Sequence, residues 1–406
     1  MLYSRIIAWF MWMVASLFYA YQYILRVMPN IMMGDITQQF HIDATLFGQF
    51  SGVYYIGYSL MHLPIGIMLD RFGPKNVMSS CILLTTLGLL PILFAEHWVY
   101  PLLGRALIGI GSSAAILGTF KIIRMNFNEG YFSRMLGFSV MIGLIGAVYG
   151  GAPVSYLCTL WGYKAVIELF AIIGLLLALL TYIIVPNSKP ETGSVSIFSD
   201  IKTIVTNRTI ILFCCFAGLM LGPLEGFSDV WGSGFFQEVY GFGKSTSNYL
   251  PSMIFIGMCF GSPVLSLIAE KTGYYLATII AAGLLMFFVF SALVFGLLNS
   301  AAINIGLLAV GICCAYQILV IYKVSTYAPA RLAGLATAVA NMMIMLFGYV
   351  FHTIIGYVIN VCGGVHSASA FIYGVSVIPI GLLLGIAGFL TLAFQKQIKF
   401  RNGREL

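Results

Sequence analysis

The stretch GIMLDRFG at residues 66–73 has a counterpart, SLIAEKTG, at residues 266–273, 200 residues further along the chain. The two copies share an acidic residue, a basic residue and a glycine, namely Asp70, Arg71 and Gly73 in the first and Glu270, Lys271 and Gly273 in the second. A second pair, RMLGFS at 134–139 and RLAGLA at 331–336, has nearly the same separation. Two copies of one unit, in the same orientation, therefore make up the chain.

The composition is that of an integral membrane protein. Of the 406 residues, 60% are hydrophobic and 8% are charged, against about 25% charged in a soluble domain. Apolar stretches of about 20 residues, enough to cross a bilayer as helices, recur along the whole chain. We expect an all-α membrane protein of two pseudo-symmetric six-helix bundles, with twelve spans near residues 6–28, 44–68, 75–95, 98–123, 134–157, 163–185, 209–236, 246–269, 274–297, 301–325, 331–358 and 367–394.

A polar stretch in the middle of the chain predicts the boundary between the bundles. We expect an N-terminal bundle over residues 1–185, a linker over 186–208, a C-terminal bundle over 209–394 and a tail over 395–406. Loops and tails on one side hold fourteen Lys and Arg residues and the other loops hold Lys164 and Lys244. This bias places both termini, the linker and the tail in the cytoplasm. We expect a multi-pass protein of a bacterial inner membrane.

Several classes of function lack the residues they need. The net charge of +7 comes mostly from the inner loops, so no basic surface for nucleic acid is expected. The eight cysteines lie in or beside apolar spans without metal-ligand spacing, and the five histidines are scattered. We therefore expect no metal site, no cofactor and no enzymatic activity. The phosphate-binding pattern G-x-x-x-x-G-K-[ST] is absent from the sequence, which excludes ATP drive within this chain.

The segment GIMLDRFGPK, Gly66 to Lys75, resembles the signature loop of the major facilitator superfamily between its second and third helices. The resemblance implies a transporter fold with a gating set of Gly66, Asp70, Arg71, Gly73, Lys75, Glu270 and Lys271. Gly66 should permit close helix approach. Asp70 should pair with a cation or a helix N-terminus of a neighbouring helix when the inner side is closed.

The fourth span carries a second motif of the same superfamily. In GRALIGIG, residues 104–111, an arginine is followed by two glycines at Gly109 and Gly111. The resemblance implies that Arg105 is a buried charge associated with proton coupling or with the site. Insertion of a buried arginine costs about 2.5–3.5 kcal/mol, so it needs a partner or a wet cavity. A purely structural pairing remains the alternative.

The first span predicts part of a binding site. Tyr19, Tyr23 and Arg26 lie at i, i+4 and i+7, on one helical stripe. Together with Trp231 in VWGSGFF, this pattern resembles the bacterial branch of phagosomal-type nutrient transporters, which includes amino-acid and nucleoside carriers and relatives that move carboxylate siderophores. We expect Tyr19, Tyr23, Arg26, Lys121 and Trp231 to bind substrate. An interfacial aromatic belt for the tyrosines and a snorkelling Lys121 remain open.

The seventh span contains two acids, Glu225 and Asp229, in LGPLEGFSDVWGSGFF at residues 221–236. Adding the repeat separation to Arg26 leads to residue 226, between these acids, so cation and acids occupy equivalent places in the two halves. We expect them to face each other across a central cavity. Arg26 and Asp229 would then form an outer gate, or Glu225, the deeper acid, would load a proton. A structural ion pair remains the third possibility.

These expectations combine into one function. We expect a proton-coupled secondary transporter that imports a small carboxylate-bearing solute, with an amino acid as the first choice and its partners limited to solute, protons and lipid. A polycarboxylate such as a ferric carboxylate siderophore, or a nucleoside, is an alternative substrate. A non-transporting membrane sensor is the alternative outside transport. We expect a monomer.

Overall fold

The computed structural model describes residues 2–186, 197–329 and 332–401, and over these residues it is built from helices without a strand. The first part of the chain, to residue 186, forms nine helices, which are α1 (Leu2–Ile31), α2 (Met33–Phe40), α3 (Ala44–Leu87), α4 (Leu90–Phe94), α5 (Val99–Ser112), α6 (Ala114–Asn126), α7 (Glu129–Gly150), α8 (Ala152–Trp161) and α9 (Tyr163–Ile184). The residue Arg331 of the second sequence repeat lies outside the described part.

The second part of the chain follows the same all-helical pattern. Its helices are α10 (Ile197–Val205), α11 (Arg208–Gly226), the π-helical turn η1 (Phe227–Trp231), α12 (Gly232–Glu238), α13 (Lys244–Tyr249), α14 (Ser252–Thr272), α15 (Tyr275–Val294), α16 (Ser300–Cys314), α17 (Tyr316–Tyr327), α18 (Ala333–Val361) and α19 (Ala368–Arg401). The helix α10 falls inside the stretch expected to be a linker and packs against α11 and α18. The helix α19 continues past residue 394, into the expected tail.

The number of membrane crossings agrees with the sequence. Ten helical stretches in the described residues are long and apolar enough to span a membrane, and the pair Arg134–Gly150 and Ala152–Trp161, bent by 41°, adds an eleventh. The longest stretch, Ala44–Phe94, has 51 residues, about twice what a bilayer needs. It turns at Gly73, where φ is 78°. Counting its two arms separately gives twelve crossings, and the all-α membrane fold is confirmed.

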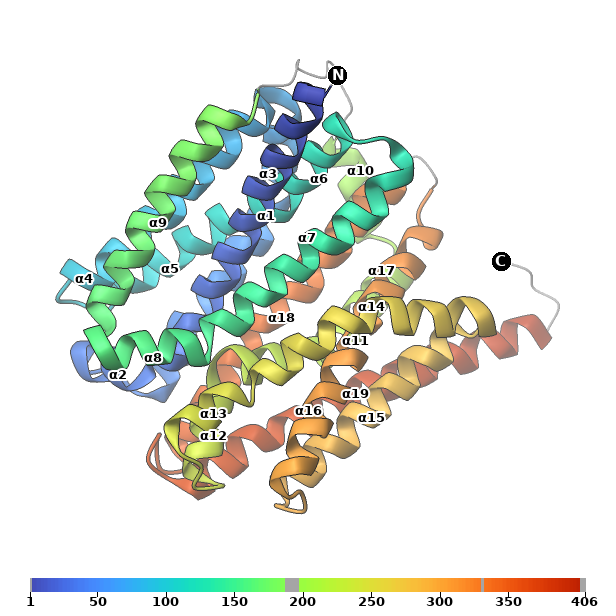
Figure 1. The fold of residues 1–406 in the computed structure, drawn as a ribbon. Helices are drawn as coiled ribbons and strands as arrows, with labels where there is room; N and C mark the ends of the chain where they lie inside the picture. Colours follow the sequence, from blue (N-terminus) through green and yellow to red (C-terminus); the bar gives the residue numbers. More distant parts are fainter. Residues whose placement is uncertain (1, 187–196, 330–331, 402–406) are drawn as a thin grey trace.

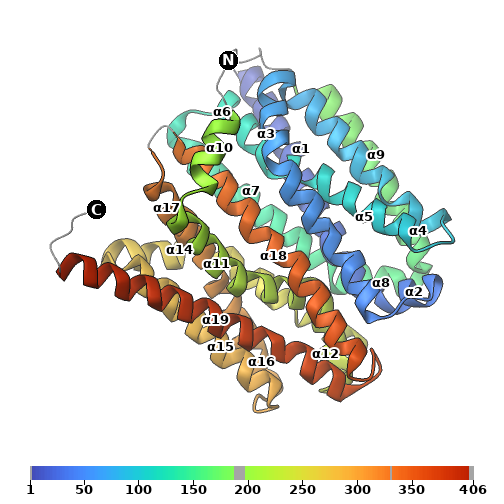
Figure 2. The same ribbon diagram turned by 180° about the vertical axis from the view of Figure 1, so that it is seen from behind.

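The helices form two groups that diverge toward one end of the molecule. Helices α1 to α9 make up one group and α11 to α19 the other (Figures 1 and 2). The groups approach each other at the end that carries α2, α8, α12 and α13, which we call the far end. They separate toward the end where both chain termini lie, which we call the terminal end. Helix α18 of the second group packs along α3 of the first.

The internal repeat is visible in the backbone. Gly73 and Gly273, which correspond in the sequence, both have positive φ, of 78° and 71°. A Cβ atom on Gly109 of α5 would lie 2.0 Å from the carbonyl oxygen of Tyr54 in α3, and one on Gly311 of α16 would lie 2.0 Å from that of Ile254 in α14. The equivalent helix pairs of the two groups thus pack backbone against backbone, as small residues allow in membranes.

These contacts predict the effect of adding a methyl group at Gly109. The substitution Gly109→Ala drives Cβ into the Tyr54 carbonyl, and overpacking of this kind costs about 1–3 kcal/mol. The matched control is Gly137→Ala in α7, where a Cβ atom meets nothing within 4 Å. In detergent, we expect a lower melting temperature for Gly109→Ala and an unchanged or higher one for Gly137→Ala. Equal melting temperatures for the two variants would contradict this packing.

Candidate functional site

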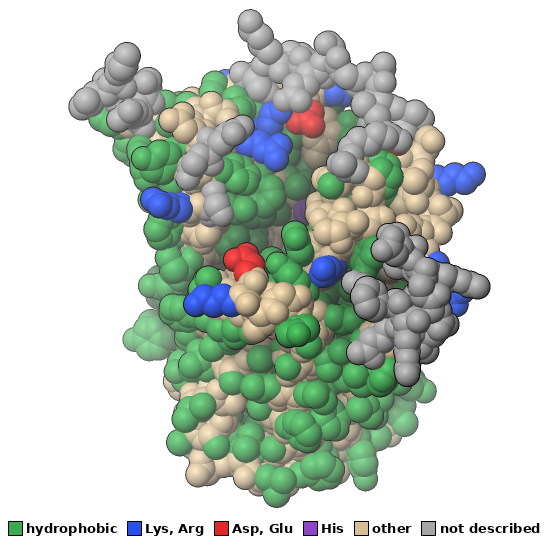
Figure 3. All heavy atoms as spheres, turned by 90° about the vertical axis from the view of Figure 1, so that its right-hand side faces the viewer, with side chains coloured by type: hydrophobic (Ala, Val, Ile, Leu, Met, Phe, Trp, Pro, Cys, Tyr) green, Lys and Arg blue, Asp and Glu red, His purple; other side chains and the backbone are tan. Residues whose placement is uncertain are grey.

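A cavity of about 1020 Å³ lies between the two groups of helices. Its wall comes from α1, α3, α6 and α7 on one side and from α14, α16, α17 and α18 on the other. Figure 3 shows the molecule hollowed between its two halves, with basic and acidic side chains around the opening. The lining includes Asp70 and Arg124 toward the terminal end and Arg26 at depth. The cavity is therefore open toward the terminal end.

At the deep end of the cavity, Arg26 and Tyr55 of its wall belong to a buried charge cluster that also contains Glu225 and Asp229, two acids that lie behind the wall. The Nε atom of Arg26 lies 2.7 Å from Oδ2 of Asp229, and its guanidinium is also ion-paired with Glu225. The hydroxyl of Tyr55 donates to Glu225 at 2.7 Å and contacts Asp229 as well. All four side chains are less than a tenth exposed. Because Arg26 and Tyr55 belong to the first group and the acids to the second, this charge cluster joins the groups.

The local helix geometry lets both acids reach the guanidinium of Arg26. Glu225 and Asp229 are four residues apart, so they lie on one helix face. Asp229 belongs to the π-helical turn η1, where the N–H of Gly232 bonds the carbonyl of Phe227. Such single π turns are frequent at functional sites. The pairing of Arg26 with Asp229 that the repeat predicts is present in the structure.

Arg105 holds the backbone of α1 behind Arg26. Pro29 lies inside α1 and has no N–H, so the carbonyl of Leu25, four residues earlier, lacks its helical partner. The Nη1 atom of Arg105 donates to this carbonyl at 2.7 Å, and its guanidinium lies 5.3 Å from the ring centroid of Tyr54. Arg105 is 2% exposed and is not among the residues of the cavity wall. Its contacts are those of a positioning residue.

A second group of charges lies at the mouth of the cavity. The Nζ atom of Lys121 in α6 is 2.8 Å from Oδ1 of Asp70, whose side chain is 53% exposed. Arg124 lies over the ring of Phe132 at 5.6 Å. Asp70 therefore pairs with a cation of a neighbouring helix, and the partner belongs to the same group of helices. The sequence predicted this pairing for the state in which the inner side is closed. Here the pair is formed while the cavity is open at this end, so that part of the prediction is wrong.

The remaining residues expected in the gate lie outside the cavity wall or only at its rim. Gly66 lines the cavity, and a Cβ atom there would meet nothing within 4 Å, so its expected role in close helix approach is wrong. Lys75 lies over the ring of Tyr182 in α9 at 4.2 Å. Gly73 is the buried residue at which α3 turns. The last three members of the set, Arg71, Glu270 and Lys271, are exposed.

The aromatic residues expected to bind substrate divide into two cases. Tyr19 and Tyr23 line the cavity and are 8% and 9% exposed, so they do not form an interfacial belt. Trp231 is fully buried elsewhere, where its Nε1 donates to the carbonyl of His352 at 3.2 Å. It packs against Phe47 in α3. The structure therefore does not bring Trp231 to the cavity.

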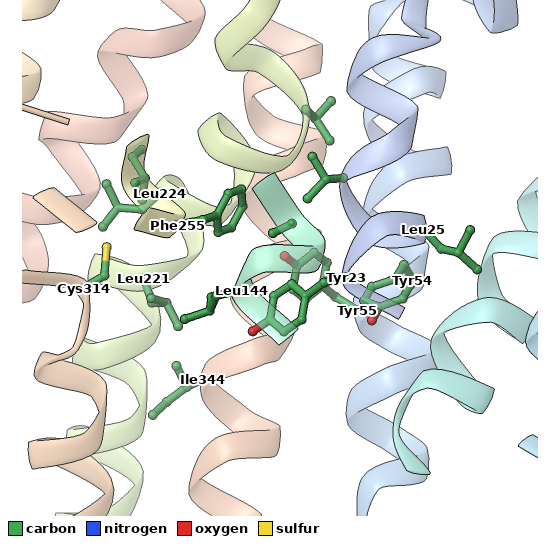
Figure 4. Packing of buried hydrophobic residues seen from close by; sticks show 14 of the residues in the cluster. Tyr23, Leu25, Tyr54, Tyr55, Leu144, Leu221, Leu224, Phe255, Cys314 and Ile344 are labelled. Carbon is green, nitrogen blue, oxygen red and sulfur yellow. The ribbon is translucent and has the colours of Figure 1, made fainter. Parts of the chain in front are cut away.

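Sequence reasoning missed a row of rings on α3. Tyr54, Tyr58 and His62 follow one another at intervals of four residues and line the cavity with Tyr55. The hydroxyl of Tyr54 donates to Gln22 of α1 at 2.5 Å. Figure 4 shows Tyr23, Tyr54 and Tyr55 close together beside the helices of the first group. The signal that could have found them is the i, i+4, i+8 spacing of polar rings in an otherwise apolar span.

Hydrogen bonds between the two groups close the far end. The Nδ2 atom of Asn360 in α18 donates to Asp43 at 2.9 Å, and that of Asn248 in α13 donates to Ser155 in α8 at 2.7 Å. At this end the backbones of α3 and α18 also lie in close contact. A Cβ atom on Gly48 of α3 would lie 2.5 Å from the carbonyl oxygen of His352 in α18. The far end is thus sealed while the terminal end is open.

Comparison with known proteins gives a family of membrane transporters and relatives named for transport, extrusion or drug resistance. The sequence model of the Major Facilitator Superfamily matches residues 11–353. A nitrite extrusion protein of Bacillus subtilis is 20% identical over 338 residues, 80% of either chain. A chloramphenicol resistance protein of Acinetobacter baumannii is 29% identical over 47% of this chain and 46% of its own length. A probable L-galactonate transporter of Escherichia coli is 21% identical over 54% and 52%. The matched region spans about half the length of the last two relatives.

Solved structures share the fold over almost the whole chain. A crystal structure of the nucleoside transporter NupG has a TM-score of 0.77 at 13% identity, covering 94% of this chain and 99% of that one. A bacterial homologue of the human lysosomal transporter Spinster, in an inward-facing and unoccupied conformation, has a TM-score of 0.72 at 14% identity, covering 95% and 97%. At these identities the likeness concerns the fold.

The contact between Arg105 and the Leu25 carbonyl can be tested by a double-mutant cycle. Arg105→Leu leaves this buried carbonyl unpaired, which costs about 1–3 kcal/mol. Pro29→Ala supplies the missing N–H, so Arg105→Leu should lower the melting temperature less in the Pro29→Ala background, with a coupling of about 0.5–3 kcal/mol. Pro64→Ala in α3 is the matched control and should combine additively with Arg105→Leu. If the effects of Arg105→Leu and Pro29→Ala on the melting temperature are also additive, Arg105 does not stabilise the protein through the Leu25 carbonyl.

Proposed function

The chain belongs to the Major Facilitator Superfamily, and we propose that it is a proton-coupled secondary transporter that imports a small carboxylate-bearing organic solute by alternating access. An amino acid is the class that fits best. The observation that carries the proposal is the charge cluster, in which Arg26 is held by two carboxylates and a tyrosine at the deep end of the cavity. The protein would act in a bacterial inner membrane with both termini in the cytoplasm.

The charge cluster supports coupling between a proton and a carboxylate. Arg26 carries one positive charge against the two negative charges of Glu225 and Asp229 when both acids are ionised. Protonation of one acid balances the charges and releases part of the guanidinium, which has five N–H donors in a fixed fork. A substrate carboxylate can take the released position. Because each ligand improves the site for the other, the two would bind together.

Glu225 is the better proton site of the two acids. Both carboxylates are ion-paired with Arg26 and contact the Tyr55 hydroxyl, but Asp229 is 1% exposed and Glu225 is 6% exposed. Glu225 borders a small space between α11 and α14, and the residues Met258 and Cys314 line both this space and the main cavity. We propose that a proton reaches Glu225 through this space, while Asp229 stays paired with Arg26.

The same residues support a transport cycle. With both acids ionised, the charge cluster holds the two groups together at its depth and the cavity is open toward the terminal end. When Glu225 carries a proton and Arg26 binds a substrate carboxylate, loss of that proton into the open cavity restores the bond between Glu225 and Arg26 and displaces the substrate. Release at the terminal end is import if that end is cytoplasmic, as the distribution of Lys and Arg predicts.

The names of two relatives favour an anionic solute, because nitrite and L-galactonate are both anions. A polycarboxylate such as a ferric carboxylate siderophore is the second candidate, favoured by the two further cations of the wall, Lys121 and Arg124. A nucleoside is the third, favoured by the tyrosines. A thermal-shift screen with amino acids, carboxylates and nucleosides separates these classes, because a specific ligand stabilises the folded state. A sensor would bind a ligand without accumulating it in vesicles.

The role of Glu225 can be tested in proteoliposomes with a solute identified by this screen. An imposed gradient of one pH unit supplies about 1.4 kcal/mol per proton, enough for about tenfold accumulation at one proton per solute. Glu225→Gln removes the proton site but keeps a hydrogen-bonding group for Tyr55, so we expect no accumulation but preserved counterflow exchange.

The matched control is Glu96→Gln, a change to an exposed glutamate between α4 and α5, which should accumulate solute like the unchanged protein. If Glu225→Gln still accumulates solute, Glu225 does not carry the proton. If it is folded but has lost exchange as well, Glu225 acts in binding or gating instead.

A further inference from the structure

The cavity has charged ends and a neutral middle. Arg26 lies at its deep end, and Asp70, Lys121 and Arg124 lie at its mouth. Between them the wall presents uncharged hydrogen-bonding side chains, which we call the neutral band and define as Tyr58 and His62 of α3, Ser262 of α14, Gln317 of α17 and Asn341 of α18. The proposed function uses the charged residues and leaves the neutral band without a role.

The neutral band lies within reach of a solute bound at Arg26. Tyr58 and His62 follow Tyr55 by three and seven residues on α3, which is about 5 and 10 Å along the helix. On the opposite wall, Gln317 follows Cys314 by three residues, or about 5 Å, and Cys314 borders the small space beside Glu225. Both walls thus carry polar groups within one to two helical turns of residues at the deep end of the cavity.

One wall of the neutral band is a pair of amides. The Nε2 atom of Gln317 donates to Oδ1 of Asn341 at 3.1 Å. This bond leaves the carbonyl oxygen of Gln317 as an acceptor and the NH₂ group of Asn341 as a donor. A ligand with a donor and an acceptor in one plane can bond to both. An apolar ligand would leave these groups unpaired, and such mismatches are strongly rejected.

The other wall of the neutral band is aromatic. The rings of Tyr54 and Tyr58 are stacked, with centroids 6.0 Å apart and an interplanar angle of 19°, and the ring of His62 lies 5.3 Å from that of Tyr58. His62 is 5% exposed, and its Nδ1 has no hydrogen-bond partner in the described part of the chain. Aromatic rings attract other rings beyond their burial of area. This wall therefore favours a flat ligand that can also hydrogen-bond.

We propose that the solute carries, besides its carboxylate, a planar conjugated ring with hydrogen-bonding atoms, which binds between Tyr58 and His62 on one side and Gln317 and Asn341 on the other. The class includes heteroaromatic amino acids and heteroaromatic carboxylic acids. The proposal rests on the proposed function, because it takes the carboxylate at Arg26 as given. It adds the chemistry of the other end of the solute, about 5–10 Å away along the cavity.

The test uses three kinds of probe on the purified protein, with the melting temperature as the readout. L-tryptophan and orotate carry both a planar hydrogen-bonding ring and a carboxylate. Tryptamine and uracil keep the ring and lack the carboxylate. L-cyclohexylalanine and cyclohexanecarboxylate keep the carboxylate on a puckered apolar ring. We expect at least one probe of the first kind to bind at least about tenfold more tightly than its two partners, a difference of about 1.4 kcal/mol.

The outcomes separate the two proposals. Equal binding of planar and puckered carboxylates would overturn the ring inference and leave the carboxylate transporter standing. Equal binding of a ring with and without its carboxylate would support the neutral band and count against the proposed function. If no probe binds, the ring inference fails, and the proposed function is decided by the wider thermal-shift screen.

Variants locate the ring in the structure. Gln317→Leu and Asn341→Leu should each reduce the preference for the planar probe to less than about threefold, while binding of the puckered carboxylate is unchanged. The matched control is Asn304→Leu in α16, an amide that is not part of the cavity wall and whose Nδ2 bonds the carbonyl of Ser300. Unchanged preference in both cavity variants would overturn the proposal, and a loss in the control as well would assign the effect to stability.

Discussion

The guanidinium of Arg26 is the group on which the rest of the structure depends. A membrane-embedded arginine is costly unless it is paired, and removing one partner from a buried ion pair typically costs 3–5 kcal/mol. Here the partners come from the other group of helices, so the two groups must meet at this depth for the charges to be satisfied. The π turn that carries Asp229 and the Tyr55 hydroxyl complete the pairing. In the proposed function, a solute and a proton rearrange this same interaction, which also holds the two groups together.

Much of this arrangement could be predicted from the sequence, because it follows from periodicity and from the repeat. The apolar period gives the spans, and the separation between the repeats places Arg26 opposite Glu225 and Asp229. Contacts that depend on rotation about a helix axis could not be predicted in the same way. Trp231 is only two residues from Asp229, yet it faces His352 instead of the cavity. The hydrogen-bond partner of Arg105 could not be predicted either. It is a backbone carbonyl that Pro29 leaves without a helical partner, and the residue type of Leu25 gives no indication of this.

The two halves share their backbone packing and differ in the side chains that they present. Corresponding glycines at Gly109 and Gly311 bring equivalent helices into backbone contact. The cavity wall of the first half, by contrast, is rich in tyrosine, while that of the second carries amides, sulfur-containing side chains and small residues. The repeat therefore maintains the framework, and the asymmetry of the wall gives a bound solute one orientation. A symmetric cavity would bind it equally well in two.

The glycine contact between α3 and α18 at the far end also determines what kind of surface an opening would expose. Gly48 lies against the carbonyl of His352, with no side chain between the two helices at that point. Separation there uncovers peptide groups, which can hydrogen-bond to water, beside the aromatic pair of Phe47 and Trp231. An opening at this end would therefore offer a polar solute hydrogen-bonding partners next to an aromatic surface.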